Sequence, residues 1–488
     1  MRLGRSFKLL AVLLAFVLLV VVYVAQRTVQ HNESEKPTVF VHLFEWAWPD
    51  IANECETFLG AHGYAAVQIS PPHEHVVGDP WWTRYQPVSY RLESRGGTRA
   101  QFEDMVRRCN AAGVDIYADA VINHMSAISE GAGEGVGVAG SLYRRYEYPV
   151  PYEAGDFHYC GRYDDDMIRN YQDAWEVRNC ELGGLNDLKT GEAAVQEKIA
   201  AYLADLLDTG VAGFRIDAAK HMEPADITAI LDRLPGQPFI FQEVIDRGNE
   251  PIKGEEYTAN GHVTELKYGM ALSSAFSSGQ LGGLESLGSA DGWLPSELAV
   301  ISVDNHDVQR GHAGGEGILT HKDWKTYELA NIFMLAWPYG YPKVMSSYQF
   351  DDSDQGPPSI RPVGSDGACN REWVCEHRSP AIVAMVGFRN RTDGQPVTGW
   401  RQLGPSAIAF SRGDRGFVAI NAGQVAVSAS VPVGLAPGRY RNLLEGAVGA
   451  DGSVQAELVV DREQNVLITL PPLSAIATDA GTADQHDE

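Results

Sequence analysis

Residues 211–217 have the sequence Val-Ala-Gly-Phe-Arg-Ile-Asp, a short and mainly apolar run that ends in a carboxylate. Such a run is typical of a β-strand that is buried on both faces. The segment before it, Glu192–Asp208, is rich in Ala and Leu at helical spacing and is soon followed by Gly210, which suits a helix end. A helix and a strand therefore follow one another here, as they do in α/β folds with a parallel sheet.

The same unit recurs along the chain. Short β-branched or aromatic runs that end in polar residues, most of them followed by a helical segment, occur at Val39–Phe44, Tyr64–Ser70, Val114–Ile122, Val211–Asp217, Phe239–Val244, Val263–Leu266, Val300–Asp304 and Lys343–Ser347. Eight such units predict an α/β fold of the (β/α)8 TIM-barrel type. An open, doubly wound sheet is the alternative that the same pattern allows.

Two stretches interrupt the alternation. A segment rich in Gly, Tyr and Asp after the third strand is too long for a simple loop, and it predicts an inserted domain at the carboxyl end of the barrel. From about residue 392 the helical pattern stops, and alternating runs such as Phe417–Asn421 and Val466–Leu470 predict an antiparallel β-sandwich. The predicted domains are the barrel (37–123 and 188–391), the insertion (124–187), the C-terminal sandwich (392–477) and a polar tail (478–488).

The composition limits the class of partner. The 488 residues include 39 Lys and Arg against 64 Asp and Glu, so the formal net charge is −25. Hydrophobic residues make up 44% of the chain, enough for large cores and too many for intrinsic disorder. The negative charge argues against a nucleic-acid partner, because the phosphates would be repelled. We expect a monomer.

The amino terminus predicts export. Three basic residues within the first eight precede Leu9–Ala25, a stretch of 17 residues without a charge. That length lies between a secretory signal and a membrane span, so residues 1–30 are predicted to be a signal peptide or a membrane anchor formed by residues 9–25. In either case the remainder lies outside the cytoplasm, in an extracellular or periplasmic space. The six cysteines are then expected to be paired.

Three acidic residues stand where a barrel would place its chemistry, at the carboxyl ends of strands. Asp217, Glu243 and Asp307 end the fourth, fifth and seventh predicted strands or follow them closely, so only a closed barrel brings them together. Two carboxyl groups about 5–5.5 Å apart can cleave a glycosidic bond, because one attacks the anomeric carbon while the other protonates the leaving oxygen. Arg215, two residues before Asp217 on the same strand face, would keep that carboxylate ionised.

Aromatic residues near the second strand support a carbohydrate site. Trp81, Trp82 and Tyr85 follow that strand, and their rings suit stacking on the apolar faces of sugars. A metal-dependent hydrolase is an alternative from another class, since Asn123-His124 and Asp304-Asn-His-Asp307 also resemble clusters of metal ligands.

Seven segments together resemble the α-amylases of glycoside hydrolase family thirteen, in particular the animal-type, chloride-activated branch. They are His42–Trp46, Pro80–Tyr90, Asp119–His124, Gly210–His221, Phe241–Asp246, Val303–Gly311 and Val344–Tyr348, and the similarity extends from about Val39 to Ile476. The resemblance implies that Asp217 is the nucleophile, Glu243 the general acid/base and Asp307 the transition-state stabiliser. Contacts with glucosyl units are implied for Trp81, Trp82, Tyr85, Gln86, His124, Arg215, Lys220, His221 and His306.

Two ion sites follow from the same resemblance. A calcium ion is implied at the side chains of Asn123 and Asp187 and the main-chain oxygens of Arg178 and His221, and all-oxygen ligation suits this cation. From the residues alone, Asp187 could equally be a helix N-cap. A chloride ion is implied at Arg215, Asn305 and Lys343.

Lysine stands at position 343 where the animal enzymes usually have arginine. We therefore expect weaker chloride binding, because an ammonium is a point charge without the guanidinium fork. Alternatively, Lys343 simply pairs with Glu243.

The family pattern also selects, from 15 possible sets, the disulfide pairs Cys55–Cys109, Cys160–Cys180 and Cys369–Cys375.

The implied activity is endo-hydrolysis of α-1,4-glucosidic bonds in starch, glycogen and related glucans by a retaining double displacement. Two alternatives remain open. One is an α-glucan transglycosidase that uses the same site, and the other is a non-catalytic, membrane-anchored binding protein that resembles an amylase. Members of the second group typically lack the acids, whereas all three acids are present here.

Overall fold

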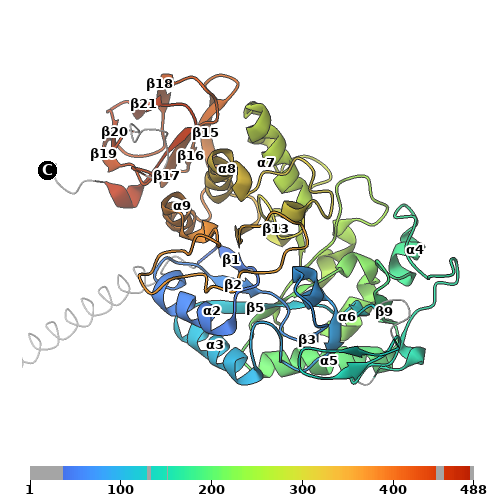
Figure 1. Ribbon diagram of the computed structural model, residues 1–488. Helices are drawn as coiled ribbons and strands as arrows, with labels where there is room; N and C mark the ends of the chain where they lie inside the picture. The colour runs from blue at the N-terminus through green and yellow to red at the C-terminus, as the bar shows by residue number, and fades with distance from the viewer. Residues whose placement is uncertain (1–36, 129–132, 151, 447–454, 484–488) are drawn as a thin grey trace, which may run out of the picture. The chain divides into compact units, whose positions relative to one another are not determined.

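The computed structural model describes residues 37–128, 133–150, 152–446 and 455–483 (Figure 1). The predicted signal or anchor in residues 1–30 lies outside the described residues. Within the described residues, no helix is long and apolar enough to cross a membrane.

Eight parallel strands close into a barrel in the order β1-β14-β13-β12-β11-β10-β5-β2, which confirms the predicted TIM-barrel fold. The strands are β1 Phe40–Leu43, β2 Ala66–Ile69, β5 Asp115–Ala120, β10 Gly213–Ile216, β11 Phe239–Gln242, β12 His262–Thr264, β13 Ala299–Ile301 and β14 Tyr341–Ser346. Each overlaps one of the eight predicted runs. The register pairs Arg215 on β10 with Asp119 on β5 and with Phe241 on β11.

Side chains fill the barrel rather than leaving a pore. Phe40, Ala66, Tyr117, Phe241 and Val300 come from five different strands and form one buried cluster. The ring of Phe40 meets the rings of Tyr117 and Phe241 at centroid distances of 5.5 and 5.6 Å. This packed interior fixes the strand ends that support the site.

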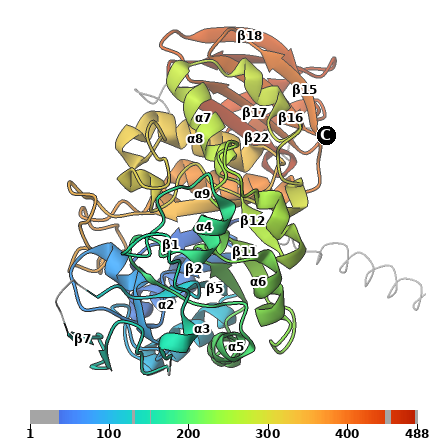
Figure 2. The ribbon, with the colours of Figure 1, turned by 90° about the vertical axis from the view of Figure 1, so that its right-hand side faces the viewer.

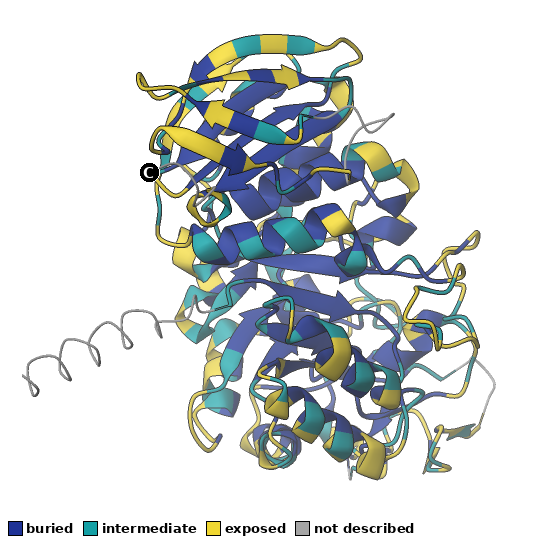
Figure 3. Ribbon diagram, turned by 90° about the vertical axis from the view of Figure 1, so that its left-hand side faces the viewer, coloured by how far each residue is buried: buried dark blue, intermediate teal, exposed yellow. Residues whose placement is uncertain are grey.

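Helices follow the strands as predicted. They are α2 Trp48–Glu54, α3 Arg99–Ala111, α5 Ala193–Asp208, α6 Pro224–Leu231, α7 Leu266–Ser278, α8 Trp324–Ala336 and α9 Pro380–Arg391. A capping box formed by Thr98 and Gln101 begins α3. Helix α8 is buried along most of its length, because it contacts barrel strand β14 as well as β17 (Gly416–Asn421) and β22 (Ser474–Asp479) of the C-terminal domain. Figure 2 labels α8, β17 and β22, and Figure 3 shows which parts of the helices are buried.

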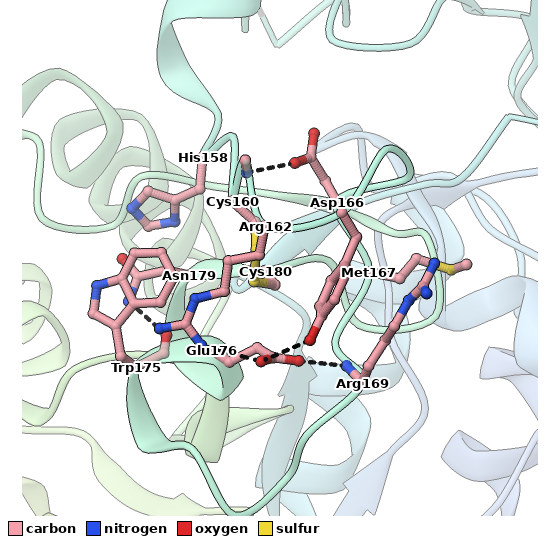
Figure 4. Close-up of a disulfide and its surroundings, with 12 residues drawn as sticks. His158, Cys160, Arg162, Asp166, Met167, Arg169, Trp175, Glu176, Asn179 and Cys180 are labelled. Carbon is pink, nitrogen blue, oxygen red and sulfur yellow. Dashed lines mark hydrogen bonds and ion pairs between the residues drawn. A yellow bond between two sulfur atoms is a disulfide. The ribbon is translucent and has the colours of Figure 1, made fainter.

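The segment between the third and fourth barrel strands leaves the barrel and returns to it. Its first strand, β6 (His124–Met125), pairs antiparallel with its last, β9 (Asn186–Asp187). Between them lie β7 (Gly135–Val136), β8 (Leu142–Tyr143) and α4 (Ala174–Asn179), while β3 (Glu74–His75) and β4 (Pro87–Ser89) form a separate pair before the insertion. Figure 4 shows the Cys160–Cys180 disulfide in this segment, with Arg162 lying over the ring of Trp175.

The C-terminal domain is an antiparallel sandwich of two four-stranded sheets, as predicted. One sheet has the order β15-β16-β17-β22 and the other β18-β21-β20-β19. The strands are β15 Val397–Gln402, β16 Ala407–Arg412, β17 Gly416–Asn421, β18 Val427–Pro432, β19 Gly438–Arg441, β20 Glu457–Val460, β21 Asn465–Leu470 and β22 Ser474–Asp479. An apolar core with members from both sheets lies between them.

The end of this domain differs from the predicted boundary at residue 477. Thr478 and Asp479 still pair with β17, and a 3₁₀ turn covers Ala480–Thr482. Asp479 is buried because its carboxylate accepts a hydrogen bond of 2.7 Å from Arg391 at the end of α9. Two polar residues that resembled the start of a tail are therefore part of the sheet.

Candidate active site

A cleft of about 570 Å³ lies at the carboxyl ends of the barrel strands. The three predicted acids, Asp217, Glu243 and Asp307, all line it. Predicted contact residues that also line it are Trp81, Trp82, Tyr85, Gln86, His124 and His306. The lining is completed by eight residues without a predicted contact role: Leu182, Gly183, Leu185, Ala218, Ile245, His312, Ala313 and Asp354.

One guanidinium connects three carboxylates at this site. Nη1 of Arg215 donates to Oδ1 of Asp119 at 2.6 Å and to Oδ1 of Asp217 at 2.7 Å, and Nη2 donates to Oε1 of Glu243 at 2.5 Å. Arg215 is only 3% exposed. Asp119 was overlooked as a site residue, although it stands at a strand end; the β5–β10 register places it beside Arg215.

The turn after β10 completes the contact with Glu243. Ala218 has a φ of 49°, an uncommon conformation for a residue with a side chain. Its N–H donates to Oε2 of Glu243 at 3.0 Å. The two carboxylate oxygens of Glu243 are thus held from two sides, by Arg215 and by the main chain that follows Asp217.

The crowding of carboxylates favours retention of protons. Burial raises the pKa of Asp217 well above its usual range, and Arg215 opposes that shift. Burial and the nearby Glu243 raise the pKa of Asp307 to about 7. Burial also raises the pKa of Asp119. A group of interacting carboxyls with one shared cation can hold a proton near neutral pH while another member stays ionised, which is what acid-assisted bond cleavage requires.

The cleft wall is aromatic and neutral. Trp82 is 36% exposed and offers a ring face to a ligand, whereas Trp81 is buried and donates through Nε1 to the main-chain oxygen of Ser353 at 2.8 Å. Tyr85 donates to Oδ2 of Asp119 at 3.1 Å and stacks on His306 with a centroid distance of 5.1 Å. Burial lowers the pKa of His306 well below its usual value. His306 is therefore a neutral ring at physiological pH.

Three predicted contact residues lie beside the cleft rather than in its lining: Arg215, described above, Lys220 and His221. Lys220 donates from Nζ to the main-chain oxygen of Ile245 at 2.6 Å. His221 is buried and its Nδ1 lies 2.9 Å from the main-chain oxygen of Val177. His124, which does line the cleft, contacts the oxygen of Tyr85 through Nε2 at 3.0 Å.

Asn123 and Asp187, two of the residues predicted to bind calcium, lie close together where the insertion leaves and rejoins the barrel. Asp187 belongs to β9, so it is not the helix N-cap considered as an alternative; Glu192 holds that position on α5. Oδ1 of Asn123 is buried without a hydrogen-bond partner, and His158 contacts Oδ2 of Asp187 through Nδ1 at 2.7 Å. His158 comes from the middle of the insertion, and nothing in the sequence pointed to it.

This donor set suits a hard cation. An orphaned amide oxygen beside a buried carboxylate fits calcium better than a softer metal. In the part of the chain that the structure describes, no group of three or more His, Cys, Asp or Glu side chains could hold a metal ion.

The residues predicted to bind chloride are all buried, and two of them contact the acids: Arg215 donates to Asp217, and Asn305 accepts from the main chain of Asp307. Lys343 is buried, and its Nζ donates to Oε1 of Gln68 at 3.3 Å. No ion pair joins it to Glu243 in the described structure, so the simple pairing considered above is not observed. Burial lowers the pKa of Lys343 to about 8. The side-chain oxygen of Asn305 accepts from the N–H groups of Asp307 and Val308, both at 2.9 Å.

All three predicted disulfides are confirmed. Cys55–Cys109, Cys160–Cys180 and Cys369–Cys375 have Cα distances of 5.0, 4.8 and 6.2 Å.

The third disulfide lies directly before Glu376, a fully buried carboxyl that accepts a hydrogen bond from the N–H of Ser347 at 2.7 Å. The Ser347 hydroxyl exchanges hydrogen bonds with the amide of Gln309, and Gln309 donates to Asp304 at 2.6 Å.

The buried Glu376 predicts a pH-dependent stability. Burial raises its pKa to about 8, so the folded protein binds a proton that the unfolded chain releases at lower pH. This contribution to stability is complete below the pKa of the unfolded chain and is lost as pH rises through 8. We expect the Glu376→Gln variant to lose less thermal stability than the wild type between pH 6 and 9, measured by calorimetry. Glu372→Gln, an exposed neighbour, is the control and should follow the wild-type curve; parallel curves for all three proteins would contradict the prediction.

A closed barrel with clustered acids and aromatic rings at its carboxyl end defines a glycoside hydrolase of the (β/α)8 class. The family model "Alpha amylase, catalytic domain" matches residues 63–261, and "Alpha amylase, C-terminal all-beta domain" matches residues 400–480. This chain belongs to the α-amylase family, as its sequence resemblance predicted.

Relatives over most of the chain support that membership. Pancreatic alpha-amylase 2a5 of Mus musculus is 46% identical over 451 residues, which cover 85% of this chain and 88% of the relative. The alpha-amylase of Tribolium castaneum is 45% identical and covers 90% and 95%. The crystal structure of alpha-amylase I from Eisenia fetida has a TM-score of 0.85 at 39% identity, covering 91% of this chain and 97% of that one. A glutamate-to-glutamine variant of that enzyme has been crystallised with maltohexaose.

Proposed function

We propose that this protein hydrolyses internal α-1,4-glucosidic bonds in starch, glycogen and related glucans and retains the anomeric configuration. The observation that supports it best is the shared contact of Asp217 and Glu243 with Arg215 inside one aromatic cleft. Two carboxyl groups bound to one guanidinium are close enough for nucleophile and acid to act on opposite sides of a single glycosidic bond.

In the proposed first step, the Asp217 carboxylate forms a bond to the anomeric carbon while the bond to the leaving oxygen breaks. Glu243 donates its proton to that oxygen, so the shortened glucan leaves as an alcohol. In the second step, Glu243 removes a proton from water as the water attacks the anomeric carbon and releases Asp217. Asp307 stabilises the positive charge on the sugar in both transition states, and Trp82 stacks on an adjacent ring.

The test is incubation with maltoheptaose while the anomers of the products are followed by NMR. Prompt α-anomers of mixed length support the proposal, and prompt β-anomers refute retention. Products longer than maltoheptaose would instead indicate the transglycosidase. The absence of any cleavage would indicate the non-catalytic binding protein.

Calcium and chloride belong to this proposal as bound ions. Asn123, Asp187 and the main-chain oxygens of Arg178 and His221 would hold calcium, which would tie the insertion to the barrel. Arg215, Asn305 and Lys343 would hold chloride beside the acids. A lysine at position 343 supports weak rather than tight anion binding. Export and a monomeric state complete the proposed setting.

Removal of calcium should lower the thermal stability of the protein, because a ligand that binds only the folded state stabilises it by mass action. We expect the melting temperature to fall by several degrees in excess EGTA. The Asp187→Asn variant should melt at the lower temperature with or without calcium. Glu223→Gln removes a surface partner of the Arg178 side chain without touching its carbonyl, so it should keep the wild-type response. A wild-type melting temperature that EGTA does not change would contradict the calcium site.

A further inference from the structure

Arg310 lies next to the site, in an aromatic cage. It belongs to the 3₁₀ turn Val308–Arg310 that directly follows Asp307, and it is 6% exposed. Its guanidinium carbon lies 4.9, 5.4, 5.0 and 4.3 Å from the ring centroids of Phe44, Trp81, Tyr348 and Phe350, respectively.

The charge of Arg310 has no anionic partner. Among the described residues, no carboxylate lies within 4 Å of its guanidinium, whereas Arg215 contacts three. A buried cation without a counterion is unfavourable in itself, and the faces of four aromatic rings offset part of that cost. Because no nearby anion neutralises it, the field of this cation extends to its surroundings through a medium of low dielectric constant.

The residues around Arg310 belong to the cleft or adjoin it. Nη1 of Arg310 donates to the main-chain oxygen of His306 at 2.9 Å, and its N–H donates to the oxygen of Asp307 at 2.9 Å. One cage ring, Trp81, lines the cleft together with His306 and Asp307. Arg310 therefore contacts both the segment that bears Asp307 and the aromatic wall of the cleft.

We propose that Arg310 is a positioning residue whose caged charge favours the ionised form of Asp307 and which holds the His306–Asp307 segment against Trp81. This role rests on the proposed function, in which Asp307 must be negative to stabilise a cationic transition state. It differs from that of Arg215, which binds its carboxylates directly.

The charges around Asp307 agree with this role. Burial and Glu243 raise the pKa of Asp307, and Asp119 adds a smaller increase, while Arg215 and Arg310 oppose them. His306 lies 3.4 Å from the Asp307 carboxylate but is neutral, because burial lowers its pKa. His42 and His321 also lie within the field of Arg310, and burial lowers the pKa of both. Arg310 is thus one of two cations that favour the ionised form of Asp307.

The test separates charge from packing. The activity kcat/KM on maltoheptaose is measured from pH 4 to 9 for the wild type, Arg310→Gln and Arg310→Lys. Glutamine can still donate to the His306 oxygen but is neutral. The acid limb of the pH profile, where kcat/KM falls as Asp307 is protonated, should therefore move up by about one pH unit. Activity on that limb should then fall about tenfold. Lysine keeps the charge and should leave the limb within a few tenths of a unit.

Lys322→Gln is the matched control. Nζ of Lys322 lies 3.8 Å from the centroid of the same Phe350 ring, but Lys322 is exposed, so its loss removes one charge without altering the buried field. Its profile should equal that of the wild type. An acid limb in Arg310→Gln that matches the wild type, or an equal shift in Arg310→Lys, would overturn the proposal.

Arg310→Met is a second neutral variant, since a flexible thioether fits an aromatic cage. If both neutral variants fail to fold while Arg310→Lys folds, Arg310 serves stability alone and the proposal is refuted. A wild-type protein that does not cleave maltoheptaose would refute the proposed function instead. An active wild type with an unshifted neutral variant would refute only the role of Arg310.

Discussion

Replacing Glu243 with Gln should lower the rate of starch cleavage by about 10²–10⁴-fold, the usual contribution of a general acid. Glutamine has the same shape, and its amide oxygen can still accept from Nη2 of Arg215 or from the N–H of Ala218. It cannot give a proton to the leaving oxygen or take one from water. Both steps of the double displacement should therefore fail while the fold persists.

The measurement is the initial rate on soluble starch, together with the melting temperature and the affinity for maltohexaose. The variant should melt within a few degrees of the wild type and should bind maltohexaose with similar affinity. Glu255→Gln, an exposed carboxylate that follows the same strand, is the control and should be fully active. Full activity of Glu243→Gln would refute the proposed mechanism.

The sequence predicts the barrel because each strand is a local feature. Eight buried runs with helices between them are visible without knowledge of any long-range contact, and the structure places a strand in each. The positions of Asp217, Glu243 and Asp307 follow from the same local pattern, since all three stand at or just after the carboxyl ends of strands. One property of the fold, closure of the sheet, then brings them into a common cleft.

The features of the site that the sequence did not predict depend on contacts between residues that are distant in the chain. Asp119 is 96 residues from Arg215 in the chain and meets it only through the register of β5 and β10. His158 contacts the Asp187 carboxylate from 29 residues away in the chain, and no spacing in the sequence connects the two. The cage of Arg310 draws rings from positions 44, 81, 348 and 350, and no spacing in the sequence connects them.

A variant of Arg215 tests these contacts most directly, because Arg215 binds carboxylates from three different strand ends. Its replacement by Gln would leave the buried Asp119 and Asp217 and the half-buried Glu243 without their shared cation. Breaking a buried ion pair by removal of one partner costs about 3–5 kcal/mol, and we expect a loss of unfolding free energy in that range at pH 7. The loss should be smaller at pH 5, where the abandoned carboxyls can bind protons. Activity should fall at least about 100-fold, because the nucleophile loses the charge that favours its ionised form.

A double-mutant cycle with Asp119→Asn identifies the cause. If repulsion among abandoned carboxylates produces the loss, removing one of the three should make the double variant more stable than the sum of the single effects predicts. Urea unfolding of the four proteins measures this coupling. Arg99→Gln is the control: Arg99 pairs with Asp205 at 2.7 Å on the surface, where such pairs contribute about 0–1 kcal/mol. Additive losses in the cycle, or equal losses for Arg215→Gln and Arg99→Gln, would show that Arg215 does not balance the charges of the three acids.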